Sequence, residues 1–403
     1  MANINISIME KRKLNILFIA TEYEVKSKSI VNSYGGQASY LNNISSLIRK
    51  KNHNVSIYVV SNKIFNLTKD GIKIKFFGLN IKIPYLKKIS DFLNCIFISL
   101  HLNLVIYSEN KKKNFDVIQY PSFLNFGIFL ILPKNCRKLC RISGVTELWR
   151  KCNKQDRNLI HFISDYLEKK RVQTADKVYA PSKIISKKAS LIYSKKIYTI
   201  NSPFTKINSE SFKKIKKPSK EKLIIFVGTL NRVKGFDLLV NAFFKIFKEH
   251  KNVSLIISGR NETVENKINS INYLFQKCNK YKSRIKYLGV LPKEKIFNLY
   301  SIADASVIPS RLDNYPNVMI ESILFKKPII GFLNSSLEEV IKDKETGFLA
   351  KNKNSSNLYN KIDEFLRISK KRRKNLDKNI TKLSNKLKKI NYTKKLIDFY
   401  NIN

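Results

Sequence analysis

Acidic residues are scarce in this sequence. Of its 403 residues, 30 are Asp or Glu and 77 are Lys or Arg, which gives a formal net charge of +47. An imbalance of this size predicts an anionic partner. A nucleic acid, an anionic bilayer surface and a phosphorylated small molecule all meet that expectation, so charge alone does not choose among them. The chain is also rich in Asn and Ile, and any single lysine run is equally well explained as solvated surface.

Cysteine and histidine are also few. The cysteines form an odd, irregular set with no histidine cluster beside them: Cys95, Cys136, Cys140, Cys152 and Cys278. Cys136, Cys140 and Cys152 have no fourth ligand at a usable spacing, which favours structural thiols over a zinc site. We therefore expect reduced cysteines and no metal.

Long hydrophobic runs are absent. Residues 1–20 lack an apolar stretch followed by a small-residue cleavage site, so we expect no secretory signal and a cytoplasmic protein. Phe92 to Tyr107 comes nearest to a membrane span, but it is too short and contains Asn94, His101 and Asn103. A buried helix or one lying at a membrane interface fits better, and the lysines on both sides suit the interface. Peripheral attachment to the inner face of the cytoplasmic membrane is therefore one option.

The signatures of nucleic-acid-binding modules are missing as well. We find no helix-turn-helix, no aromatic RNA-binding strand and no zinc module, and the basic residues are spread along the chain. A basic nucleic-acid-binding protein remains an alternative, and we expect no nucleic-acid partner.

Strands and helices alternate in both halves, which predicts an α/β fold with two Rossmann-like domains built on parallel sheets. The predicted strands of the first half are 14–20, 54–60, 72–79, 115–120, 138–143 and 177–182; those of the second are 222–228, 253–259, 285–290, 305–310, 328–332 and 346–350. Hydrophobic density falls between the halves. The expected domains are therefore 1–203, a linker at 204–221, a second domain at 222–385, and a C-terminal helix at 386–403 with a return to the first domain as one option.

The second half begins with a candidate anion site. In "VGTLNRVKGFDLL", Gly228 ends a strand, Arg232 and Lys234 lie in a short loop, and Gly235 opens a helix whose apolar residues share one face. Helix N-termini at the carboxyl edge of a parallel sheet bind anions, and these cations would add to that effect. A tight turn with two solvated cations explains the loop equally well.

A second loop near the end of the sheet repeats this arrangement. Asp313 and Glu321 lie eight positions apart, and Pro316 suits the first turn of a helix that begins after Asp313 and contains Glu321. The backbone N–H groups of Asn317 and Val318 would then face the ligand edge of the sheet. Glu321 alone also fits an acid placed near a helix start, but two acids framing N–H donors suit a phosphorylated sugar.

These residues resemble the retaining GT-B glycosyltransferases, specifically glycosyltransferase family 4 (glycosyl transferases group 1). The family has an acid, seven residues and then a second Glu, which Asp313 and Glu321 match, and "KKPIIGF" and "LEEVIKDKETGFLA" are similar to the segments that follow. The resemblance covers most of the chain and is strongest from Leu223 to Ala350. It implies a GT-B fold with a cleft between two facing sheets.

The resemblance also implies roles for individual residues. Glu321 would take the nucleotide ribose, Asp313 the sugar hydroxyls, and Arg232 and Lys234 the diphosphate. Gly228, Gly259, Val290, Asn317 and Val318 would complete the donor site. In the first half, "NSYGGQASYLNNIS" is similar to the glycine loop of the family, so Gly35 and Gly36 would let the backbone approach the donor phosphate, and His53 would be structural.

The activity implied is that of a hexosyltransferase-type enzyme that uses a nucleotide-diphosphate sugar, with neither cofactor nor metal. Its acceptor would be a glycan or a lipid-linked glycan of a lipopolysaccharide, capsule or exopolysaccharide, at an anionic membrane surface. The chain departs from the family pattern at Asp313, Thr229, Ser143 and Lys327. A non-catalytic GT-B-like assembly partner is the nearest alternative, and a phosphorylase is disfavoured because nothing indicates a pyridoxal-phosphate lysine.

Overall fold

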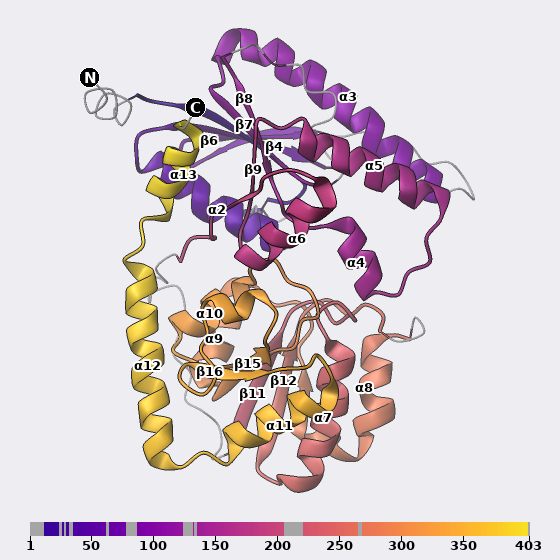
Figure 1. The fold of residues 1–403 in the computed structure, drawn as a ribbon, viewed down its shortest axis with the longest axis vertical. Helices are drawn as coiled ribbons and strands as arrows, with labels where there is room; N and C mark the ends of the chain where they lie inside the picture. Colours follow the sequence, from indigo (N-terminus) through magenta and orange to yellow (C-terminus); the bar gives the residue numbers. More distant parts are fainter. Residues whose placement is uncertain are drawn as a thin grey trace. The chain divides into compact units, whose positions relative to one another are not determined.

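The computed structural model describes residues 12–23, 26–27, 30–31, 35–61, 64–77, 87–123, 132, 135–204, 221–264 and 268–401 (Figure 1). The chain forms two compact units. The first contains Met1–Glu147, Asp156–Pro203 and Asn391–Asn403; the second contains Leu148–Gln155 and Phe204–Ile390. Most of the linker predicted at 204–221 lies outside the described residues.

The first unit is built on an eight-stranded sheet in the order β10-β9-β8-β7-β1-β4-β6-β5. All neighbouring strands are parallel except β5 and β6. The strands are β1 (Asn15–Ala20), β4 (Asn54–Val60), β5 (Phe65–Lys69), β6 (Ile72–Phe77), β7 (Val117–Pro121), β8 (Arg137–Arg141), β9 (Lys177–Ala180) and β10 (Tyr198–Thr199). A separate antiparallel pair consists of β2 (Lys26–Ser27) and β3 (Ile30–Val31).

The helices of the first unit are α2 (Gly36–Arg49), α3 (Lys87–Lys113), α5 (Leu159–Gln173), α6 (Lys183–Tyr193) and α13 (Tyr392–Asn401), while α4 (Thr146–Cys152) ends in the second unit. Apolar residues of α2 and α13 pack with strand residues in one buried cluster. Within it the hydroxyl of Tyr400 donates to Gln119 Oε1 over 2.8 Å. The end of the chain is therefore part of the core of the first unit.

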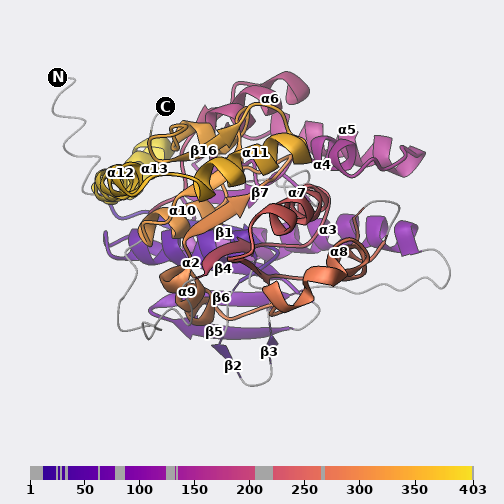
Figure 2. The same cartoon turned by 90° about the horizontal axis from the view of Figure 1, so that it is seen from below.

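The second unit contains a six-stranded, fully parallel sheet in the order β13-β12-β11-β14-β15-β16 (Figures 1 and 2). The strands are β11 (Lys222–Val227), β12 (Val253–Ser258), β13 (Ile285–Tyr287), β14 (Ala305–Ile308), β15 (Ile329–Phe332) and β16 (Gly347–Ala350). Their near-continuous apolar sequences match the rule that strands covered on both faces are hydrophobic throughout.

Helices cover both faces of this second sheet. They are α7 (Phe236–Glu249), α8 (Ser270–Cys278), α9 (Lys293–Ile302), α10 (Asn317–Leu324), α11 (Ser355–Leu366) and α12 (Lys370–Lys388), with short 3-10 helices at Asn279–Arg284 and Ser336–Glu339. Residues of α7, α8, α11 and α12 form the core on one face. Residues of α9 pack on the other face, against Leu223, Ile225 and Ile256. This arrangement confirms the predicted α/β architecture of two parallel-sheet domains.

The ends of several elements differ from the sequence prediction. The predicted strand 177–182 ends at Ala180, because the side chain of Ser182 accepts a hydrogen bond from the N–H of Ile185 and caps α6. Pro316 is the N-cap of α10, immediately before the first turn in which we placed it. The predicted helix 386–403 is divided between α12 and α13, and the unit boundary falls at Asn391.

Cys136, Cys140, Cys152 and Cys278 are thiols that form no disulfide. Burial raises the pKa of Cys140 to about 12, so this thiol stays protonated at neutral pH. His53 is buried and accepts the N–H of Leu14 at Nδ1 over 3.1 Å, which is a structural role. Among the described residues, no helix is long and apolar enough to cross a bilayer.

Candidate donor site

Most of the predicted site residues lie where the parallel strands of the second sheet end. Gly228 follows β11 and donates its N–H to Ser258 O over 2.9 Å, and Gly259 follows β12 and donates its N–H to Gly289 O over 2.8 Å. Gly259 has φ +151°, and a Cβ there would overlap the carbonyl oxygen of Gly228. The loops after β11 and β12 therefore pack backbone against backbone, which only glycine permits.

The loop after β11 also packs closely against the segment after β14. Gly235 has φ +70°, and a Cβ there would overlap the carbonyl oxygen of Pro309. The N–H of Arg311 donates to Val233 O over 2.9 Å. Because β11 and β14 are neighbours in the sheet, this packing brings residues 232–235 and 311–313 together at one edge.

The structure pairs two of the predicted charged residues directly. Lys234 Nζ lies 2.5 Å from Asp313 Oδ2, with side chains 33% and 14% exposed. Ser310 Oγ donates to the same carboxylate oxygen over 3.2 Å. A partly buried cation and anion therefore face each other at the carboxyl edge of the sheet, where anionic ligands bind in α/β proteins.

A second charged group lies beside this pair and was missed by sequence reasoning. Asp237, 1% exposed, accepts two hydrogen bonds from Arg311, over 2.6 Å and 2.5 Å. Arg232 lies 3.6 Å from the same carboxylate and donates through Nε to Cys152 O over 2.9 Å, within the second unit. Asp237 thus holds both arginines in place, and a two-pronged Arg–carboxylate contact of this kind fixes geometry strongly.

Glu321 lies in α10, the helix that follows the loop containing Asp313. Burial raises the pKa of Glu321 to about 7, although the positive charge of Lys293 and a hydrogen bond from Tyr300 oppose that rise. Asn317 and Val318 form the first turn of α10, whose leading N–H groups precede the first intrahelical hydrogen bonds. Val290 follows β13 and is 57% exposed. Val290 and the first turn of α10 therefore follow strands of the same sheet as Lys234 and Asp313 do.

The two glycines predicted in the first half lie at the start of α2 in the first unit. Gly35 is the N-cap of this helix, and Gly36 is its first residue. A Cβ on Gly35 would overlap the carboxylate of Glu22. The glycine loop therefore adjoins a helix N-terminus, as expected, while its residues 32–34 lie outside the described part of the chain.

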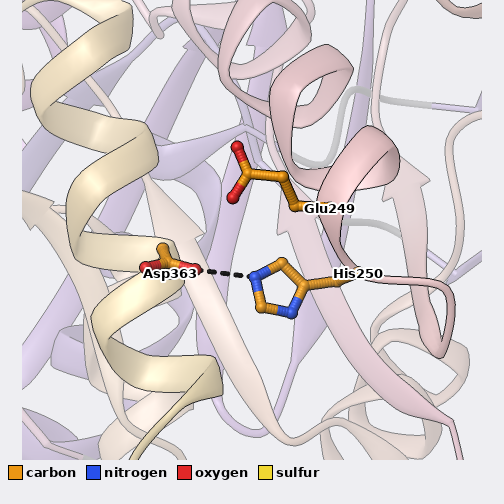
Figure 3. A group of neighbouring side chains, drawn as sticks. All are labelled: Glu249, His250 and Asp363. Carbon is orange, nitrogen blue, oxygen red and sulfur yellow. Dashed lines mark hydrogen bonds and ion pairs between the residues drawn. The ribbon is translucent and has the colours of Figure 1, made fainter.

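One group of side chains in the second unit has the composition of a metal site. Ligand atoms of Glu249, His250 and Asp363 lie within 4.8 Å of one another (Figure 3). Their oxygens are already engaged: Asp363 accepts from His250 over 2.7 Å and from Arg367 over 2.7 and 2.9 Å, and Glu249 accepts from Tyr359 over 2.6 Å. An ion-pair network that ties α7 to α11 explains this group without a metal.

Comparison with known proteins extends these findings. Residues 208–383 match the protein family described as glycosyl transferases group 1. A glycosyltransferase of Haemophilus influenzae is 24% identical over 345 residues, which cover 83% of this chain and 87% of that protein. The capsular polysaccharide biosynthesis glycosyltransferase CapM of Staphylococcus aureus is 26% identical over 144 residues, 36% of each chain.

Solved structures share the whole architecture. Sucrose-phosphate synthase from Thermosynechococcus elongatus superimposes with a TM-score of 0.73 at 18% identity, covering 96% of this chain and 97% of that one. HepE of Anabaena, in complex with UDP and glucose, gives a TM-score of 0.68 at 15% identity and covers 96% and 99%. The fold is therefore GT-B. The second unit carries the matched glycosyl transferases group 1 domain, which supports a glycosyltransferase.

Proposed function

We propose that the chain transfers a hexose, with retention of configuration, from a nucleotide-diphosphate sugar to a hydroxyl group of a glycan or lipid-linked acceptor, as members of glycosyltransferase family 4 do. The observation that carries the proposal is the Lys234–Asp313 pair, 2.5 Å apart, between the loops that follow β11 and β14. It offers a cation for a diphosphate and an acid for sugar hydroxyls at one sheet edge. HepE, which shares the fold, has been solved with UDP and glucose, in line with a donor of this class.

In the proposed reaction, Lys234 and Arg232 stabilise the negative charge that develops on the leaving diphosphate. The guanidinium of Arg232 is held in position for this role, because it lies beside the carboxylate of Asp237. The first-turn N–H groups of α10 at Asn317 and Val318 add donors aimed at the same charge. Fixed donors of this kind need no rearrangement as the bond breaks.

The two acids bind hydroxyl groups in this scheme. Asp313 accepts hydrogen bonds from the donor sugar, and Glu321 accepts them from the ribose. Gly228 and Gly259 have no side chains, so the nucleotide can lie directly against their backbone. Val290 contacts the base. The acceptor hydroxyl attacks from the face of the departing phosphate, whose oxygen takes its proton. No separate general base and no metal enters this scheme.

For the acceptor, we propose a growing surface polysaccharide at the inner face of the cytoplasmic membrane. Two features support this choice: the similarity to CapM, whose name places it in capsular polysaccharide biosynthesis, and the net charge of +47, which suits an anionic surface.

A donor panel tests the reaction. Calorimetry with a set of nucleotide-diphosphate sugars should detect binding of at least one, and NMR of the product should show the anomeric configuration of the donor unchanged. Turnover should survive EDTA. Absence of binding by every donor would favour a non-catalytic assembly partner, an inverted product would overturn retention, and activity lost to EDTA and restored by Mn²⁺ would overturn the metal-free scheme.

A further inference from the structure

Helix α3 of the first unit is apolar on two opposite sides. Leu102 and Ile106 are fully buried and attach the helix to the unit. The opposite side exposes a stripe of four large apolar side chains at spacings of three and four residues: Phe97 (46% exposed), Leu100 (40%), Leu104 (68%) and Tyr107 (50%). A soluble surface helix normally turns charged residues outward, so the outer stripe needs an explanation.

Helix α5 also exposes an apolar stripe. Val172 and Arg171 are fully buried on its inner side, while the outer side exposes Leu159 (74%), Phe162 (55%), Ile163 (40%) and Tyr166 (58%). The two helices contact each other within the first unit, and Figure 1 shows them converging. We call the eight exposed side chains the outer face of α3 and α5. Exposed apolar stripes on two helices that contact each other mark a candidate interaction site.

Cations stand over the aromatic rings of this outer face. Lys111 Nζ lies 5.0 Å from the ring centre of Tyr107, Lys170 Nζ 5.5 Å from that of Tyr166, and the guanidinium of Arg157 5.7 Å from that of Phe162. Apolar and aromatic side chains bordered by Lys and Arg are typical of helices that lie in the headgroup region of a membrane.

We propose that the outer face of α3 and α5 docks on an anionic lipid bilayer, with its apolar side chains at the boundary between acyl chains and headgroups. A second copy of the chain fits poorly, because symmetric contact would bring Lys111, Lys170 and Arg157 of both copies together. A partner protein would have to cover lysines, which protein interfaces disfavour. Arg157 also pairs with Glu147 over 3.0 Å, and the net charge of +47 favours an anionic surface over a neutral one.

This proposal rests on the membrane location in the proposed function, and binding to vesicles tests it without any sugar transfer. Vesicles of phosphatidylcholine, with or without about 30% phosphatidylserine, are mixed with the full chain and floated. Leu104→Glu with Leu159→Glu should lower the partition coefficient by at least about tenfold. The matched control is Leu191→Glu with Ile64→Glu, at 77% and 76% exposed positions of the same unit, and should change it less than about twofold.

A second pair of variants distinguishes the effect of where the lysines lie from the effect of the net charge of the chain. Lys111→Glu with Lys170→Glu changes the charge as much as Lys187→Glu with Lys188→Glu, two exposed lysines of α6. The first variant should lose at least about tenfold of its binding to anionic vesicles, and the second should retain most of it. Thermal melting checks that all four variants fold.

The outcomes are distinct from those of the donor experiment. Equal binding by all variants would overturn the docking face in favour of diffuse charge attraction. A dimer in light scattering that only Leu104→Glu with Leu159→Glu dissociates would assign the face to a second copy. Donor binding that persists in a variant unable to bind vesicles would leave the proposed transfer intact.

Discussion

The carboxyl edges of the two parallel sheets carry different chemistry. In the second unit the edge is charged and paired, with Lys234 against Asp313 and Arg311 against Asp237. In the first unit the edge is rich in hydroxyl groups: Ser122 Oγ donates to the carbonyl oxygen of Gly144 over 2.6 Å and accepts from the N–H of Ser143 over 3.2 Å, and Arg141 donates to Ser143 Oγ over 3.1 Å. Pairs of opposite charge therefore organise one edge, whereas serine hydroxyl groups and an arginine organise the other.

Buried ion pairs also fix the side chains of the charged edge in position. Asp237 is almost completely buried and accepts both arginine contacts, so Arg311 and Arg232 cannot swing freely into solvent. An isolated charge in this position would be strongly unfavourable, and its pairing removes most of that cost. In the first unit, the buried guanidinium of Arg141 is held by the hydroxyl groups of Ser143 and Ser202 and lies over the ring of Tyr40.

The largest effect should follow from removing the cation of the charged edge. Lys234→Ala takes away the charge nearest to Asp313 and should lower kcat by about 10²–10³, or roughly 2.7–4 kcal/mol in the barrier. Lys342→Ala is the control, because Lys342 forms an exposed ion pair with Glu345 in the same unit. Steady-state rates with the donor found by calorimetry measure both. A Lys234→Ala enzyme that folds and retains a third of the normal kcat would contradict the assignment.

The next effect concerns Glu321 and pH. Burial raises its pKa from 4.5 to about 7, so the folded protein holds this proton more tightly than the unfolded chain does. The resulting stabilisation is fully present below pH 4.5 and is lost as pH rises through 7, by about 3 kcal/mol in total. Urea unfolding across that range should show the slope in the native protein and a flatter profile in Glu321→Gln.

The control for this pH effect is Glu345→Gln, which changes an exposed carboxylate whose side chain is 60% exposed. It should leave the slope between pH 4.5 and 7 unchanged. Equal slopes in native protein and Glu321→Gln would show that the carboxyl group titrates normally.

Backbone packing at the charged edge comes next. Gly235→Ala meets both an unfavourable positive φ and an overlap with Pro309 O, and should lower the free energy of unfolding by about 2–3 kcal/mol. Gly289→Ala keeps the positive φ but has open space around its Cβ, so it should lose about 1 kcal/mol. Gly144→Ala has neither problem and should be near neutral. Denaturant unfolding ranks the three, and equal losses at 235 and 289 would exclude the close packing on Pro309.

The smallest effect belongs to the hydroxyl edge of the first unit. Ser122→Ala removes the acceptor and donor that join Ser143 and Gly144, in a fully buried position, and should lower the free energy of unfolding by about 1–2 kcal/mol. Ser108→Ala removes an exposed hydroxyl that bonds only within its helix turn and should change stability by less than about 0.5 kcal/mol. A loss at Ser108 as large as that at Ser122 would argue against the buried network.

The sequence predicted all six strands of the second sheet, because parallel, doubly covered strands are continuous apolar runs, but it missed β5 and β10 of the first sheet, whose residues are largely exposed or half-buried. It also placed Lys234 and Asp313 in loops at strand ends. It could not predict that Arg311 and Asp237 meet, because they lie 74 positions apart in the chain and come together only when β11 and β14 become neighbours. Only the strand order, which no local pattern encodes, brings these two residues together.

Helix α3 shows a second limit of the sequence. Its apolar residues were consistent with either a buried helix or one at a membrane interface, and both sides proved apolar, with Leu102 inward and Leu104 outward. Periodicity identifies a stripe but does not say what covers it. The choice between the two sides depended on where the helix packs.

Because α13 belongs to the first unit, the core of that unit cannot be completed until α13 has been synthesised. Leu396, Phe399 and Tyr400 belong to the core of that unit, although some 190 residues of the second unit precede them in synthesis. A ribosome therefore releases the second unit before the first has all its core side chains. A chain truncated at residue 203 would lack the core side chains of α13 and would expose the apolar residues that they cover. A single cut in the linker after residue 203 would leave the units joined covalently through residues 390 and 391.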